Sequence, residues 1–79
     1  MIVERRGAGT GALELTVNGA SRAVTATDVR GLLAELGHDP AGRGLAVARN
    51  GEVVPRHEWV RVALAPGDRI EIVGAVQGG

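Results

Sequence analysis

Two stretches of the chain, residues 13–17 (LELTV) and 69–73 (RIEIV), alternate between apolar and polar residues with the period of a half-buried β-strand. Residues 45–49 (LAVAR) are also expected to form a strand, with Leu45 and Val47 on one side. Asn18-Gly19 directly follows the first stretch, and this dipeptide favours a hairpin turn with positive φ at both positions. Residues 20–25 are therefore expected to return as a second strand.

A single helix is predicted after this hairpin. Its apolar residues recur at i, i+3, i+4 and i+7, so they form one stripe on a helix of about ten residues. Thr27 is the expected N-cap, with Asp28 in the first turn, where its charge suits the helix dipole. Gly37 is placed to end the helix in the left-handed conformation. The residues of the apolar stripe are Val29, Leu32, Leu33 and Leu36.

The second half of the chain is punctuated by turn residues. Asn50-Gly51 predicts a second tight turn. Pro55 fixes φ for the start of a short helical turn at 56–59. Residues 60–64 are expected to be extended again, with room for one more short strand. The sequence at 66–68 (PGD) is expected to form the turn into the last strand.

This order of elements predicts an α+β fold, a roll in which a mixed sheet of four or five strands curls over one helix. The domain is expected to cover residues 12–73. The stretch at 1–11 is typical of a flexible N-terminal extension, and residues 74–79 are expected to be a flexible tail. Residues 7–12 (GAGTGA) fit the dinucleotide-binding pattern, but no buried strand precedes them as that motif requires.

The composition excludes several classes of function. The chain has 79 residues, no cysteine, and nine arginines balanced by nine acidic residues, without a lysine. A neutral chain whose one aromatic residue is Trp59 lacks the basic patch and stacking side chains of a nucleic-acid binder. Its apolar runs are shorter than the roughly 20 residues of a membrane span, and its first residues lack the apolar stretch of a secretory signal. We therefore expect a cytoplasmic domain that binds neither nucleic acid nor membrane.

Few side chains outside the expected core suggest chemistry. His38 and His57 each lack the further ligands that a metal site requires, so both are expected to be solvated, and no metal site is predicted. Trp59 is expected to anchor the core, because no other aromatic residue can fill it. Arg56 is expected either to cap the short helical turn or to face a partner.

The sequence ends at Gly78-Gly79, after residues 74–77 (GAVQ), which carry no bulky or charged side chain. The α-carboxylate of Gly79 would be ionised at neutral pH, because its ordinary pKa is about 3.3–3.7, and it could attack an activated phosphate. Two residues without Cβ can turn freely and pass through a narrow tunnel. The pattern favours a carrier that a partner enzyme charges at its terminus, and an incidental frayed tail is the alternative.

Four features occur in a fixed order along residues 12–79. They are Asn18-Gly19 in the first hairpin, residues 50–56 (NGEVVPR) followed by Trp59, the turn at 66–68 before Ile70 and Ile72, and Gly78-Gly79. In this order and spacing they resemble the β-grasp (ubiquitin-like) sulfur carriers, and among them the ThiS family of thiamine biosynthesis. The small subunits of molybdopterin synthase share the fold and the diglycine, but usually carry prolines where this chain has residues 74–77. The extension at 1–11 departs from the family pattern.

The resemblance implies that this chain is a carrier and co-substrate rather than an enzyme. A ThiF-like adenylating enzyme would use ATP and magnesium to adenylate the Gly79 carboxylate. A cysteine desulfurase persulfide would supply the sulfur that converts the acyl-adenylate to a thiocarboxylate. A ThiG-like thiazole synthase would receive this sulfur for the thiazole of thiamine. Gly74, Val76, Gln77 and Gly78 would thread into the partner, and this chain would itself bind no cofactor.

Three other functions are compatible with the sequence. A carrier of the molybdopterin-synthase type would use Gly79 in the same way for a different sulfur acceptor. A ubiquitin-like modifier would form isopeptide bonds between Gly79 and target lysines, although without lysines of its own the chain could not build self-chains. A passive binding module would not need Gly78-Gly79 at all.

Overall fold

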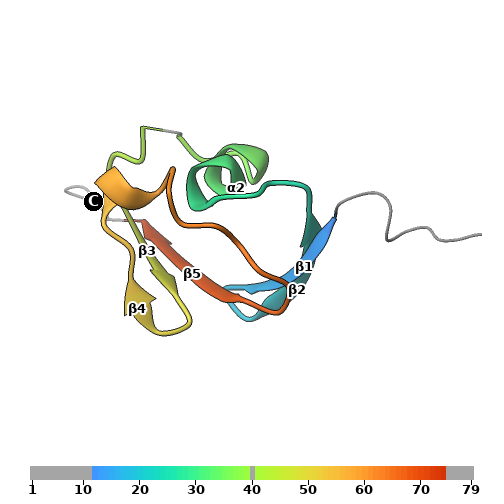
Figure 1. Cartoon of the computed structure of the whole chain (residues 1–79). Coiled ribbons are helices and arrows are strands. Elements are labelled where there is room, and N and C mark those ends of the chain that lie inside the picture. The colour runs from blue at the N-terminus through green and yellow to red at the C-terminus, as the bar shows by residue number, and fades with distance from the viewer. Residues whose placement is uncertain (1–11, 40, 75–79) are drawn as a thin grey trace, which may run out of the picture.

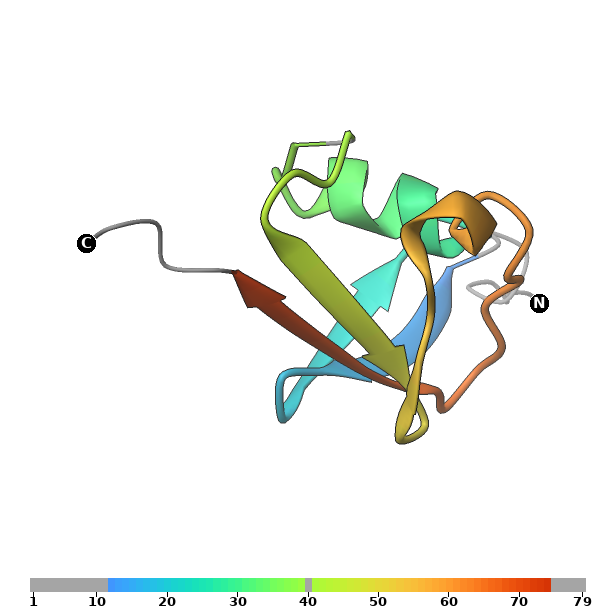
Figure 2. The ribbon, with the colours of Figure 1, turned by 90° about the vertical axis from the view of Figure 1, so that its left-hand side faces the viewer.

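The computed structural model describes residues 12–39 and 41–74, which form a mixed five-stranded sheet with the helices on one of its faces (Figures 1 and 2). The α+β roll expected from the sequence is confirmed. The predicted extension at 1–11 and the tail residues 75–79 lie outside the described residues. In chain order the elements are β1 (Leu13–Val17), β2 (Ala20–Val24), α2 (Val29–Glu35), β3 (Leu45–Arg49), β4 (Glu52–Val53), the 3-10 helix η2 (Arg56–Glu58) and β5 (Arg69–Gly74).

The last strand, β5, is the central strand of the sheet, whose order is β2-β1-β5-β3-β4. β1 runs parallel to β5, and the three other neighbouring pairs are antiparallel. The hairpins β1–β2 and β3–β4 therefore flank β5 on its two sides (Figure 1). Asn18 and Gly19 have φ of 50° and 84°, and Asn50 and Gly51 have φ of 53° and 88°, so both Asn-Gly dipeptides form the tight turns that the sequence predicts.

The core lies between the sheet and the helices. Alternation along β5 decides which side chains enter it, because Ile70 and Ile72 are buried whereas Arg69, Glu71 and Val73 are exposed. The apolar stripe of α2 faces the same core, as its spacing predicts. Further core residues are Leu15, Val17 and Val47 from the sheet and Val29, Leu32 and Leu33 from the helix.

Trp59 anchors the core at the end of η2, as expected from the sequence. The residue is 2% exposed, and its Nε1–H donates a hydrogen bond of 2.8 Å to the carbonyl of Val54, so the buried indole keeps a polar partner. Its six-membered ring packs on Gly42, which is buried and has a φ of +72°. A Cβ at Gly42 would overlap ring atoms Cζ3 and Cη2 of Trp59. The sequence pattern did not single out Gly42.

The helix has a different N-cap from the one expected. Asp28, not Thr27, caps α2, and its carboxylate accepts a hydrogen bond of 2.7 Å from the backbone N–H of Gly31. The prediction for Thr27 is wrong because its carbonyl accepts a hydrogen bond of 2.9 Å from the N–H of Leu64, which keeps that residue in extended chain before the helix. Gly37 has a φ of +88° just after the helix, as predicted.

Residues 60–64 add no strand to the sheet. The N–H of Arg61 bonds back to the carbonyl of Glu58 at 2.9 Å, so the chain continues to turn after η2. Ala63 then forms one isolated antiparallel bridge with Asp28. The expectation of another short strand is wrong, because the backbone groups of this segment pair with the chain entering α2 and not with a sheet edge.

Candidate functional site

The segment predicted to carry the reactive terminus follows directly from β5. Gly74, which the sequence assigned to the tail, is the last residue of this strand and is registered opposite Leu45 of β3. The β3 register holds β5 continuously from Ile70 to Gly74. The other predicted tail residues, Val76, Gln77, Gly78 and Gly79, lie outside the described residues.

On its other side, β5 is held first by β1 and then by one side chain. The β1 register covers only Thr16 opposite Arg69 and Val17 opposite Ile70. The Asn18 side chain then takes over, because its Oδ1 accepts a hydrogen bond of 2.8 Å from the N–H of Ile72 and its Nδ2 donates one of 3.1 Å to the carbonyl of the same residue. The amide of Asn18 thus replaces the peptide group that a longer β1 would have supplied.

Beyond this contact, the strand pairs among residues 12–39 and 41–74 hold β5 on its β3 side only. Hydrogen-bonding directions alternate along a strand, so the N–H and C=O of Gly74 point to the same side as those of Ile72, away from β3. Within the described part of the chain, the β1 register does not reach Val73 or Gly74. At its end, β5 therefore has one backbone edge with no partner strand among the described residues, and Val73 is 63% exposed.

The start of β5 is fixed by a buried carboxylate. Asp68 is 6% exposed, and its side chain accepts hydrogen bonds from Arg49 Nε at 2.8 Å, Asn50 Nδ2 at 3.0 Å and the backbone N–H of Ala65 at 2.8 Å. Asn50 also accepts a bond of 2.8 Å from the N–H of Arg69 through its Oδ1. The second Asn-Gly turn therefore holds the entry of β5 as the first turn holds its exit.

This network sets the charge state of Asp68. Burial by itself raises the pKa of the carboxyl, but the hydrogen bonds from Arg49, Asn50 and Ala65, together with the charge of Arg49, outweigh burial and hold the pKa below its ordinary value. Asp68 is thus a stable carboxylate near neutral pH. Its partners are all used in fixing the strand, so it is a structural group of this site.

A second carboxylate braces the chain between β2 and α2. Glu35 accepts hydrogen bonds from the backbone N–H groups of Thr25 at 3.0 Å and Ala26 at 2.8 Å, and from the Thr25 hydroxyl at 3.1 Å. The bond from the Thr25 backbone, followed by those from Ala26 and the hydroxyl, holds the pKa of Glu35 below its ordinary value. This contact replaces strand pairing at Thr25, so β2 ends one residue earlier than predicted.

The remaining singled-out side chains lie apart from the exit of β5. His57 is exposed, as expected, with its Nε2 at 3.7 Å from the carboxylate of Glu58. His38 is half-buried instead of solvated, because it follows the helix end and its N–H bonds to the carbonyl of Leu33 at 2.8 Å. Arg56 does not cap its own turn, and its Nη1 donates a bond of 3.2 Å to the carbonyl of Ala41.

Among residues 12–39 and 41–74, no three His, Cys, Asp or Glu side chains lie close enough together to hold a metal ion. In the same part of the chain, no helix has the length and apolar character needed to cross a membrane.

Comparisons with solved structures confirm the fold and its family. The crystal structure of the thiamine biosynthesis protein ThiS from Geobacter metallireducens is 31% identical, with a TM-score of 0.71 over 85% of this chain and 100% of that one. An NMR solution structure of a thiamine biosynthesis protein from the same organism is also 31% identical, with a TM-score of 0.69, and covers 88% of that chain.

Sequence comparisons lead to the same family. A thiazole synthase from Paramagnetospirillum magneticum is 43% identical over 68 residues, which are 85% of this chain but 20% of the relative, so the chain spans about a fifth of that protein's length. A sequence model of the ThiS family matches residues 15–79, which include the predicted carrier diglycine. The chain therefore belongs to the ThiS family, the β-grasp sulfur carriers of thiamine biosynthesis.

Proposed function

We propose that this chain carries sulfur as a thiocarboxylate on Gly79, which donates it for the thiazole of thiamine. The observation that supports this most directly is the family match, which runs through Gly78 and Gly79, on a fold whose central strand β5 leads toward them. In this proposal, the folded domain holds β5 in place, and the C-terminal residue Gly79 takes part in the chemistry.

The chemistry requires an activating partner. A carboxylate oxygen of Gly79 attacks the α-phosphate of ATP on a ThiF-like enzyme, pyrophosphate leaves, and magnesium on that enzyme balances the phosphate charge. The resulting acyl-adenylate has a good leaving group, so a sulfur nucleophile can displace AMP. With a cysteine desulfurase persulfide as donor, a second thiol must then cleave the sulfur–sulfur bond to free the thiocarboxylate.

This chain contributes position and not catalysis. β5 is held by β3 along its length and by Asn18 near its exit, so the segment that follows starts from a fixed base. A fixed base reduces the conformational freedom that is lost when a partner encloses the terminus. Gly74, Val76, Gln77 and Gly78 would then lie along the partner's channel, where their small or uncharged side chains cause little obstruction.

Thiazole synthase is the proposed recipient of the sulfur. A thiazole synthase is the 43% identical relative, and the matched segment makes up only a fifth of that longer protein. In that relative, a segment similar to this chain belongs to the same polypeptide as a much longer thiazole synthase sequence. We interpret this as support for a functional interaction between this chain and a thiazole synthase.

The proposal is tested by mass spectrometry of the intact protein. Incubation with a ThiF-like enzyme, magnesium-ATP and sulfide should replace one oxygen of the Gly79 carboxylate by sulfur, and removal of ATP should prevent this. A variant lacking Gly79 should stay unmodified while it keeps the thermal midpoint of the parent. A variant with one residue added after Gly79 that is modified as fast as the parent would refute the assignment. Higher-mass adducts on lysines of other proteins, without a thiocarboxylate, would indicate a modifier instead.

A further inference from the structure

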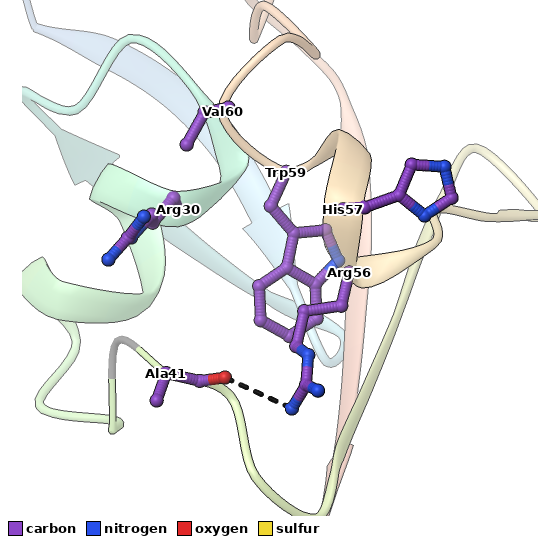
Figure 3. A pocket seen from close by; sticks show the side chains of 6 residues that line it. All are labelled: Arg30, Ala41, Arg56, His57, Trp59 and Val60. Carbon is purple, nitrogen blue, oxygen red and sulfur yellow. Dashed lines mark hydrogen bonds between the residues drawn. The ribbon is translucent and has the colours of Figure 1, made fainter.

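A hollow of about 250 Å³ lies between α2 and η2, away from the residues that hold β5. Arg30 of α2 lies on one side, Arg56 lies on the other, and Trp59 forms the wall between them (Figure 3). Ala41 and Val60 complete the lining together with His57, whose ring points away from the other labelled side chains in Figure 3.

The hollow is positively charged and has no acidic side chain in its lining. Arg30 forms no ion pair or side-chain hydrogen bond with the described part of the chain, and Arg56 uses one donor on the carbonyl of Ala41. A guanidinium has five N–H donors in a planar fork that matches a carboxylate. The two arginines thus present donors for which the described residues supply no anionic acceptor.

The walls of the hollow are fixed before any ligand arrives. The backbone N–H of Arg30 donates a hydrogen bond of 3.2 Å to the carbonyl of Trp59, which ties α2 to the end of η2. The indole is held in turn by its bond to Val54 and by its packing on Gly42. A site with fixed walls loses little conformational freedom on binding.

We propose that this hollow is a docking socket for one acidic side chain of the thiazole synthase partner. Its volume is below the roughly 300–1,000 Å³ of small-molecule sites, so it suits a single side chain better than a nucleotide. Val60, which is 53% exposed at the rim, adds apolar contact, and arginine beside a tryptophan is typical of the residues that dominate protein interfaces. The identity of the partner rests on the proposed function, whereas the charge and shape of the socket do not.

The test compares three variants that each remove one positive charge. Arg30→Gln and Arg56→Gln each remove one guanidinium from the lining of the socket. Arg22→Gln, at an exposed position of β2, is the matched control. Titration calorimetry against purified thiazole synthase should show Kd raised about tenfold by each socket variant, with a weaker dependence on salt, and little changed by Arg22→Gln. Arg56→Gln also removes the bond to Ala41, so the thermal midpoint of this variant is measured as well. If that midpoint falls, the test depends on Arg30→Gln, because the Arg30 side chain forms no hydrogen bond or ion pair with the described residues.

The outcomes separate this inference from the proposed function. If the parent binds thiazole synthase and both socket variants bind equally well, the socket is wrong, while thiocarboxylation of Gly79 is unaffected. If the parent does not bind thiazole synthase, the socket as proposed is wrong as well, and the mass-spectrometry experiment judges Gly79 separately. A further experiment titrates the parent with inorganic phosphate and follows the Trp59 Nε1–H resonance by NMR. A saturable shift that is lost in Arg30→Gln would show that the socket is a site for free anions, and this result would overturn the proposal.

Discussion

The two Asn-Gly turns of this domain have the same sequence and nearly the same backbone, and each sends its asparagine side chain to β5. Asn50 bonds to the N–H of Arg69 and to Asp68, where the strand begins. Asn18 bonds to both backbone groups of Ile72, near where the strand ends. The two turns therefore act as clamps at opposite ends of the strand that leads to the predicted carrier terminus.

The clamps differ in how many groups support them. Asn50 belongs to a network in which Arg49 and the N–H of Ala65 also bind the buried carboxylate of Asp68. Among the described residues, Asn18 acts alone on this side with two side-chain hydrogen bonds, and beyond it the β1 register has ended. The entry of β5 is therefore fixed several times over, whereas the β1 side of its exit depends on one side chain. We infer that the entry stabilises the fold and that the exit governs how firmly the terminus is presented.

The largest effect is expected from Asp68→Ala, which breaks the entry clamp. The substitution leaves Arg49, Asn50 and the N–H of Ala65 without their acceptor, so the free energy of unfolding should fall by about 3 kcal/mol. That is a large share of the stability of a small domain. Urea unfolding followed by Trp59 fluorescence measures it, with Glu52→Ala, at an exposed position of β4, as control. A loss equal to that of the control would show that the network is dispensable.

The next effect is expected from Asn50→Asp, which places a second carboxylate beside Asp68. The exchange removes the donor of a 3.0 Å bond and adds like-charge repulsion, so the free energy of unfolding should fall by about 2 kcal/mol at pH 7. Acidification that protonates one of the two groups should recover part of this loss. Asn50→Gly, which loses the amide without gaining charge, should show no such recovery in parallel urea titrations at both pH values. Equal pH dependence in the two variants would contradict the explanation.

A smaller but more local effect is expected from Asn18→Gly. Glycine tolerates the positive φ of this position, so the turn should survive while both bonds to Ile72 are lost, at a cost of about 1 kcal/mol. Hydrogen exchange measured by NMR should accelerate at the amide of Ile72 and leave that of Arg69 unchanged, and Asn50→Gly should give the reverse pattern. Unchanged exchange at Ile72 would mean that β3 alone holds the exit.

The smallest effect is expected from pH acting on the parent protein. The folded-state pKa of Asp68 is held below its ordinary value of 3.8, so its contribution to stability is present above that value and is lost as the pH falls through the folded pKa. Glu35 should contribute in the same direction. Thermal midpoints from pH 7 down to about 2 should therefore fall mainly below about pH 4, and Asp68→Asn should flatten this slope without abolishing it. An unaltered slope in Asp68→Asn would remove Asp68 as its source.

The sequence was sufficient to predict an element wherever a short local pattern is compatible with one kind of secondary structure. Alternating residues at 13–17 and 69–73, two Asn-Gly dipeptides and one apolar helical stripe each act within a few residues, and each matches the structure. The cap at Asp28 and the turning segment at 60–64 were missed for one shared reason. In both places the local turn is accompanied by hydrogen bonds between segments more than thirty residues apart, such as that from Leu64 to Thr27.

Gly42 and the two clamps show the same limit at the level of side chains. Nothing near Gly42 in the sequence indicates that the Trp59 ring will lie on it. Asn18 and Asn50 predicted turns correctly, but the reach of their amides to β5 follows from strand order. One signal was available, since only an amide among the side chains favoured in such turns can both donate to and accept from a peptide group.

The sequence by itself determined the elements, the family pattern and the diglycine that would carry the chemistry, because these depend on residue type and spacing. The tertiary structure decided that β5 lies between the two hairpins, that the Asn18 side chain binds this strand near its end, and that Arg30, Arg56 and Trp59 line one hollow. These features arise from contacts between residues distant in the chain, and only the packed sheet and helices bring such residues together.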